Sequence, residues 1–293
     1  MYTSQKYNVP TSGTMAHSWV QSFNSEYEAF KAYAETYPND CMLLVDTYNV
    51  LKSGIPNAIK VFNEVLLPLG CRPKGIRIDS GDLAYLSKKA RKMLDEAGFE
   101  DCKICGTNAL DEFLITSLLD QNAEIDSFGV GENLITAQSN PVFGGVYKLA
   151  AIEENGVITP KIKVSENIEK ITNPGFKKLY RFYNNKTGKA IADLITLNDE
   201  EISTDEYTIF DPISPWKKKT LTEYTLKPLH TKIFENGKLI YTSPTLTEIA
   251  NNAKNELDTL WDEVKRLNNP HKYYVDLSQE LWDLKQKLLE EIN

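Results

Sequence analysis

The sequence predicts an α/β protein: an incomplete (β/α) barrel followed by a small β-rich and helical C-terminal region. Three observations lead to this fold class. In residues 1–150, short apolar runs alternate with segments of helical period. A polar or glycine residue follows each of these runs. In residues 151–293 the pattern changes to hairpin-like strands and two amphipathic helices, so we expect a second domain there and a functional rim on the partial barrel.

The strand–helix units of the first half follow one another along the chain. The earliest is expected as a strand in residues 6–13 with a helix from His17. Later apolar runs predict strands at 42–45, 75–78, 103–105 and 125–130. Segments of helical period predict helices at 57–69, 83–97 and 112–119, the second ending at Gly98. A closed barrel of this kind needs about eight strands, so we expect an open one that lacks its beginning.

The second half is expected to be mostly antiparallel. Its predicted strands lie at 143–152, 157–164, 178–183 and 190–197, the last two joined by a turn at 184–188. Residues 200–245 are expected to be β-rich, and two helices are expected at 245–267 and 277–292.

Composition excludes several classes of protein. The chain has 293 residues, a formal net charge of −8 and 41% hydrophobic residues, which argues against nonspecific nucleic-acid binding. No apolar run approaches the roughly 20 residues that span a bilayer, and the N-terminus has no apolar signal segment. Four irregularly spaced cysteines fit reduced thiols in the cytoplasm. Cys102 and Cys105 form a CxxC that we expect on a strand, where it suits neither zinc nor redox chemistry.

Polar residues gather where the predicted strands end. In parallel sheets the chemistry lies at the carboxyl ends of the strands, so these residues are expected to converge. They could also simply make turns. The strand ends are Gly13-Thr14, Asp46-Thr47, Asp79-Ser80-Gly81-Asp82, Thr107-Asn108 and Gly129-Val130-Gly131.

Three side chains at this rim predict chemistry. Arg77 and Asp79 alternate on one strand and therefore point to the same side, where a guanidinium can pair with an anion and a carboxylate can accept hydrogen bonds. The alternative is a buried pair that stabilises the rim. His17 is one of three histidines in the chain; by itself it fits a capping or packing residue, and a carboxylate such as Asp46 would hold its tautomer in a catalytic role.

Several motifs occur here in the order seen in nicotinate phosphoribosyltransferases: SGTMAHSW, LLVDTYNV, GIRIDSGDL, FGVGENLIT and FGGVYKL. The C-terminal region of that family is resembled by the stretch NPHKYYVDLSQELWDLKQKLL. The resemblance covers essentially the whole chain. It implies a barrel of the type II phosphoribosyltransferase kind, with the N-terminal region of the family absent from this sequence.

The resemblance also implies an activity: transfer from 5-phosphoribosyl-1-pyrophosphate to nicotinate in NAD salvage, coupled to ATP hydrolysis through a phosphohistidine at His17. This makes the enzyme a glycosyltransferase and ligase, homodimeric when complete. Asp46 is the expected partner of His17. Nicotinate is expected to contact Thr14 and Arg77, while sugar and phosphate groups are expected at Asp79, Ser80, Gly81, Asp82, Thr107, Asn108, Gly129, Gly131 and Thr136. Mg²⁺ is expected at Asp79 and Asp82.

Three points stay open at this stage. Glu132 stands where the family commonly carries threonine, and an acid does not suit a phosphate cradle. The chain could be a truncated, catalytically incompetent member of the family that acts only as a folded or partner-dependent module. A sugar-phosphate lyase is a weaker alternative, because no lysine for a Schiff base stands at a predicted strand end.

Overall fold

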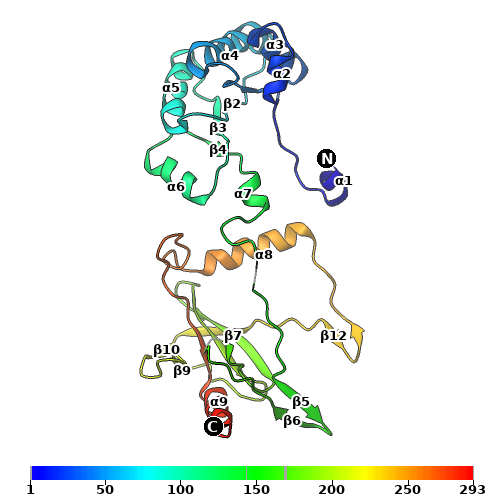
Figure 1. Cartoon of the computed structure of the whole chain (residues 1–293), viewed down its shortest axis with the longest axis vertical. Helices are drawn as coiled ribbons and strands as arrows, with labels where there is room; N and C mark the ends of the chain where they lie inside the picture. Colours follow the sequence, from blue (N-terminus) through cyan, green and yellow to red (C-terminus); the bar gives the residue numbers. More distant parts are fainter. Residues whose placement is uncertain (1, 143, 168–169, 293) are drawn as a thin grey trace. The chain divides into compact units, whose positions relative to one another are not determined.

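The computed structural model describes residues 2–142, 144–167 and 170–292. The chain divides into two compact units, Met1–Gly144 and Gly145–Asn293 (Figure 1). The N-terminal unit contains a four-stranded parallel sheet, and the C-terminal unit contains the hairpins. No helix within the described ranges is both long and apolar enough to cross a membrane.

The N-terminal unit is built on a parallel sheet in the order β1-β2-β3-β4. Its strands are β1 (Met42–Leu44), β2 (Gly75–Ile78), β3 (Lys103–Gly106) and β4 (Ser127–Phe128). Leu44 pairs with Arg77, and Arg77 pairs with Cys105. The first three strands therefore end at the same edge of the sheet, where the residues that follow them can meet.

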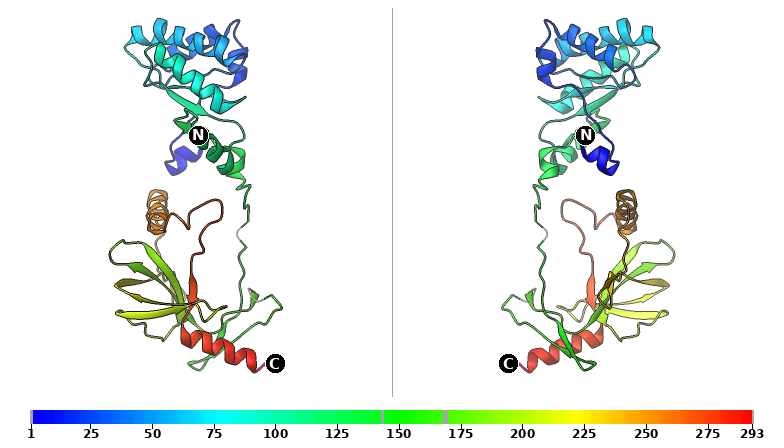
Figure 2. Two further views of the ribbon diagram at one scale, coloured as in Figure 1. Left: turned by 90° about the vertical axis from the view of Figure 1, so that its left-hand side faces the viewer. Right: turned by 90° about the vertical axis from the view of Figure 1, so that its right-hand side faces the viewer.

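Helical segments connect successive strands of this sheet, as parallel pairing requires, and further helices precede β1 and follow β4 (Figure 2). The helices are α1 (Tyr2–Tyr7), α2 (His17–Gln21), α3 (Glu26–Thr36), η1 (Val50–Gly54), α4 (Ile55–Val61), η2 (Phe62–Leu66), η3 (Leu67–Leu69), α5 (Leu83–Glu96), α6 (Glu112–Asp120) and α7 (Glu132–Ile135). Gly98 has φ +81° directly after α5, which confirms the predicted helix end. Phe30, Phe62 and Phe99 are fully buried in the core between helices and sheet.

Of the predicted incomplete barrel, the parallel sheet with its helices is confirmed, and it does not close into a barrel within the described residues. The described residues form an open four-stranded parallel sheet, with β1 and β4 at its edges. The strand predicted in residues 6–13 is wrong: α1 ends at Tyr7, and residues 8–13 are exposed and belong to no strand. Apart from Tyr7, the apolar side chains of that stretch are Val9 and Pro10, so the segment has no hydrophobic face to bury. Proline has no backbone N–H to donate to a neighbouring strand, so the hydrogen-bonding groups are also incomplete.

The C-terminal unit centres on a sheet in the order β11-β7-β8-β14. Its strands are β5 (Ala151–Glu154), β6 (Val157–Pro160), β7 (Lys177–Asn184), β8 (Ala190–Leu197), β9 (Glu206–Phe210), β10 (Lys218–Thr222), β11 (Tyr224–Pro228), β12 (Phe234–Glu235), β13 (Lys238–Leu239) and β14 (Val275–Leu277). The predicted hairpin of β7 with β8 is confirmed. Phe182, Leu194 and Tyr224 lie in its core.

Two predictions for this unit need correction. The strand expected at 143–152 is limited to β5, and residue 143 lies outside the described residues. The helix expected at 245–267 is α8 (Leu246–Thr259), which stops because Leu260 is extended and the Trp261 indole N–H donates to the Ala190 carbonyl at 2.9 Å. The last helix, α9 (Gln279–Glu290), follows β14, a short parallel strand that was not predicted.

The four cysteines are free, as predicted. Cys102 lies buried directly before β3 and Cys105 lies half-buried within it. Burial raises the pKa of the Cys41 and Cys102 thiols to about 12. These two thiols are therefore protonated and inert at neutral pH.

Candidate active site

The candidate site lies at the carboxyl ends of β1, β2 and β3 in the N-terminal unit. Asp46 follows β1, Asp79 follows β2 and Thr107 follows β3. Thr14 and His17 join them from the segment that leads into α2. The structure thus brings together side chains from four separate stretches of the first 107 residues, as the strand-end pattern predicts.

Asp46 is the buried anchor of the cluster, with its side chain only 1% exposed. Its Oδ2 accepts hydrogen bonds from the Asp79 backbone N–H at 2.9 Å and from the Ser80 hydroxyl at 2.6 Å. Its Oδ1 has no hydrogen-bond partner among the described residues and lies 3.9 Å from His17 Nε2. One carboxylate oxygen therefore fixes the β2–α5 turn, and the other is directed at the imidazole.

His17 is the first residue of α2, and its side chain is 39% exposed. Its Nδ1 lies 3.2 Å from the Thr47 hydroxyl oxygen, and its Nε2 lies 3.4 Å from Asp79 Oδ2. Two carboxylates beside Nε2 favour a proton on that nitrogen, and the Thr47 hydroxyl then donates to Nδ1. The ring is oriented on both sides and still open to solvent. Thr47 was expected at a strand end but not as a partner of His17.

Arg77 and Asp79 point to the same side of β2, as their alternation predicts. Arg77 Nη1 donates to the Thr14 hydroxyl at 2.7 Å and to the Met15 carbonyl at 3.5 Å, while Nη2 lies 3.7 Å from Asp79 Oδ1. Its Nε is buried and has no hydrogen-bond partner within the described segments. The guanidinium is 22% exposed, so the pair is neither fully buried nor free in solvent.

The turn after β2 connects the cluster to α5. Gly81 has φ +81°, a conformation that suits glycine. Asp82 is exposed and caps α5, because its Oδ1 accepts the Tyr85 backbone N–H at 2.9 Å. Asp79 lies in the cluster, and its Oδ1 also accepts a hydrogen bond from the Thr107 hydroxyl. The structure thus places one of the two expected metal ligands beside His17 and the other at the helix cap.

The expected phosphate cradle follows β4. A Cβ on Gly129 would lie 2.6 Å from Thr107 Cγ2, so a larger residue here would displace the Thr107 side chain. Gly131 precedes α7, a helix of four residues, with open space beside its Cα. Thr136 lies at the far end of α7, and its hydroxyl donates to the Glu132 carbonyl at 2.8 Å. The geometry therefore brings Gly129 to Thr107. Asn108 follows Thr107 with φ +96° and is exposed.

No group of three or more histidine, cysteine, aspartate or glutamate side chains in the described part of the chain could hold a metal ion by itself. Magnesium in phosphate-transferring sites commonly uses only one or two carboxylates together with substrate oxygens. The cluster contains two acids, one arginine and one histidine. It offers a nucleophilic imidazole, a carboxylate pair and a cation for an anionic substrate.

Comparisons with known proteins agree with this picture. The family described as "Nicotinate phosphoribosyltransferase C-terminal domain" matches residues 176–285. The chain is 47% identical over 291 residues to the nicotinate phosphoribosyltransferase of Bacillus subtilis and 38% identical over 275 residues to that of Dictyostelium discoideum. These alignments cover 98% and 88% of this chain but 58% and 46% of the relatives, so the chain spans about half the length of these relatives.

A solved structure gives the same result. The crystal structure of human nicotinic acid phosphoribosyltransferase matches with a TM-score of 0.74 and 25% identity, over 98% of this chain and 64% of the human chain. The similarity thus extends through both units. Over nearly its whole length the chain is therefore similar to nicotinate phosphoribosyltransferases, and residues 176–285 match the C-terminal domain of that family.

Proposed function

We propose that this chain carries the reaction centre of an enzyme that joins nicotinate to 5-phosphoribosyl-1-pyrophosphate, releasing nicotinate mononucleotide and pyrophosphate in NAD salvage. The observation that supports this best is the His17 ring, held between the Thr47 hydroxyl and the carboxylates of Asp46 and Asp79. The names of the relatives support the same reaction class. The cytoplasm is the proposed location, and a complete member of the family is proposed to be a homodimer.

Arg77 and Thr14 are the proposed partners of the nicotinate carboxylate. A guanidinium binds a carboxylate through two parallel hydrogen bonds, and it can also stack on an aromatic ring. The hydrogen bond from Arg77 to the Thr14 hydroxyl keeps the two groups together. Because Arg77 is only 3.7 Å from Asp79, the carboxylate of the base would lie directly beside the proposed sugar site.

His17 is the proposed acceptor of the γ-phosphoryl group of ATP. With the proton on Nε2, the Thr47 hydroxyl releases Nδ1, whose lone pair attacks the γ-phosphorus; the bond to the β,γ-bridging oxygen breaks, and ADP leaves with the bonding electrons. The ring becomes cationic in this step, and the neighbouring carboxylates of Asp46 and Asp79 stabilise it through the Nε2 proton. Hydrolysis of the phosphorus–nitrogen bond by water then releases phosphate and regenerates His17.

Mg²⁺ is the proposed cation for the pyrophosphate group. Asp79 and Asp82 are solvent-accessible carboxylates, the oxygen donors that a hard cation prefers. They would hold the ion together with oxygens of the substrate. When bound, Mg²⁺ would neutralise the charge that develops on the departing pyrophosphate. Sugar and phosphate groups are proposed to contact the turn residues Ser80 and Gly81. They are also proposed to contact the backbone at Thr107, Asn108, Gly129 and Gly131.

The activity can be tested directly. The purified chain is incubated with nicotinate, 5-phosphoribosyl-1-pyrophosphate, Mg²⁺ and ATP, alone and together with the separately produced N-terminal part of the Bacillus subtilis relative. Nicotinate mononucleotide is measured by liquid chromatography. We expect product in at least the supplemented sample, with ATP raising the yield. No product in either sample would refute the proposed reaction.

A further inference from the structure

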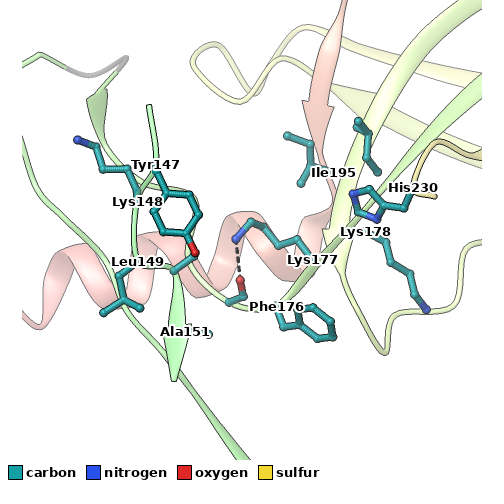
Figure 3. A pocket seen from close by; sticks show the side chains of 12 residues that line it. Tyr147, Lys148, Leu149, Ala151, Phe176, Lys177, Lys178, Ile195 and His230 are labelled. Carbon is teal, nitrogen blue, oxygen red and sulfur yellow. Dashed lines mark hydrogen bonds between the residues drawn. The ribbon is translucent and has the colours of Figure 1, made fainter. Parts of the chain in front are cut away.

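The C-terminal unit contains a cavity of about 510 Å³ whose lining holds three lysines and one histidine and no carboxylate (Figure 3). Three stretches form it: residues 147–151, residues 175–179 and His230, with Ile195 of β8 behind them. The Gly175 N–H donates to the Ala150 carbonyl at 2.8 Å, and the Leu229 N–H donates to the Leu179 carbonyl at 2.9 Å. These hydrogen bonds hold the three stretches together.

Lys177 supplies the charge inside this cavity. Its Nζ donates to the Gly175 carbonyl at 2.6 Å, a neutral acceptor. Burial lowers the pKa of the Lys177 amine. Within the described ranges, no carboxylate forms an ion pair with it. A half-buried cation is costly unless an anion pairs with it, and this chain, which carries a net charge of −8, places no acid there.

The other lysines of the lining are oriented differently. Figure 3 shows Lys177 extending toward Tyr147, whereas Lys148 and Lys178 point away from it. Neighbouring residues of a strand face opposite sides, which explains why Lys178 does not share the direction of Lys177. The remaining wall is mainly apolar, with Leu149, Phe176 and Ile195 among its side chains.

A second lysine of this unit is also partly buried and donates to a neutral oxygen. Lys285 on α9 is partly buried, its Nζ donates to the Asn173 side-chain oxygen at 2.8 Å, and burial lowers the pKa of its amine. Leu284 beside it lies against Gly175, with 3.6 Å between Leu284 Cδ2 and the position of a Cβ there. This unit thus contains two partly buried lysines whose amines donate to neutral oxygens.

We propose that this cavity binds a small organic carboxylate with a flat apolar body, with Lys177 as the ion-pair partner of the carboxylate. Its volume lies in the range of small-molecule sites, which combine apolar walls with a few polar anchors. The apolar wall favours an organic anion over a bare inorganic one. The rings of Tyr147 and His230 also line the cavity and can contact the body of the ligand. The inference concerns the C-terminal unit alone and is independent of the reaction proposed for His17.

The probe for this site is benzoate, titrated into the 293-residue chain by calorimetry, with benzamide as the neutral analogue and inorganic phosphate as the inorganic anion. We expect benzoate to bind, and benzamide and phosphate to bind at least about tenfold more weakly. Lys177→Gln should weaken benzoate binding by about tenfold or more, the range of a lost charge-assisted contact. Lys177→Arg, which keeps the charge, should restore most of it.

Lys178→Gln is the matched control, since it removes the same charge from the adjacent residue, and it should change benzoate affinity less than twofold. Arg77→Ala tests for binding at the candidate active site and should leave the Lys177-dependent binding unchanged. Thermal unfolding checks that the variants fold. The inference would be overturned if benzoate did not bind, or if benzamide or phosphate bound as tightly as benzoate. It would also be overturned if Lys178→Gln weakened benzoate binding as much as Lys177→Gln, or if only Arg77→Ala weakened it.

Discussion

Replacing Asp46 tests how one buried carboxylate serves both the fold and the imidazole. Its Oδ2 accepts two hydrogen bonds, from the Asp79 N–H and the Ser80 hydroxyl, and its Oδ1 faces His17. Hydrogen bonds to a charged group contribute about 1.5–3 kcal/mol each. Asp46→Ala should therefore lower the free energy of unfolding by about 3 kcal/mol or more. Asp46→Asn keeps an acceptor oxygen for both donors, so its loss should be nearer 1 kcal/mol.

The functional effect of the two variants should be similar, although their effects on stability differ. Asp46→Asn places an amide instead of a charged oxygen beside His17 Nε2, so the ring loses part of its electrostatic support. We expect phosphorylation of His17 by ATP to slow at least about tenfold. Urea unfolding and the initial rate of label transfer measure the two effects. Phosphorylation at the wild-type rate in Asp46→Asn, or equal destabilisation by both variants, would refute this account of Asp46.

Three further predictions concern charged side chains. Arg77→Ala should weaken nicotinate binding roughly thirtyfold, the equivalent of about 2 kcal/mol, and unchanged binding by calorimetry would make Arg77 structural. Asp79→Asn and Asp82→Asn should each raise the Mg²⁺ concentration needed for half-maximal turnover, whereas unchanged values in both would assign these carboxylates to the turn and the helix cap. Burial and the nearby Asp211 carboxylate raise the pKa of Asp276 to about 6, above the unfolded value of about 3.9. Stability should therefore fall by about 2 kcal/mol between pH 4 and pH 6, and Asp276→Asn should remove this fall in thermal unfolding; an unchanged pH dependence would contradict the argument.

The strand-end cluster could be predicted because it depends on local patterns. An apolar run followed by a polar residue marks both a buried strand and its end, and parallel pairing brings such ends to one edge. Asp46, Arg77, Asp79 and Thr107 lie together for this reason. Thr47 was not predicted as the partner of His17, because the contact depends on the orientation of a ring 30 residues away in sequence.

The errors have equally specific causes. The expected strand at residues 6–13 rested on a short extended run with no hydrophobic face, and extended sequence alone does not specify a pairing partner. The expected helix at 245–267 was too long because helical period continues past Thr259, whereas the Trp261 indole is held by the distant Ala190 carbonyl. The basic cavity at Lys177 could not be predicted, since it arises where three stretches of the C-terminal unit meet.

The measurement that tests the central claim most directly is the labelling of His17. The chain, supplemented if needed with the N-terminal part of a relative so that it makes nicotinate mononucleotide, is incubated with γ-labelled ATP. The predicted product is an acid-labile, base-stable phosphoprotein, as a phosphorus–nitrogen bond requires. His17→Ala should abolish the label and the stimulation by ATP while a slow basal transfer remains, and His271→Ala, in the C-terminal unit, should still be labelled. Label retained in His17→Ala under conditions in which the wild type is active would contradict the assignment of His17 as the phosphoryl acceptor.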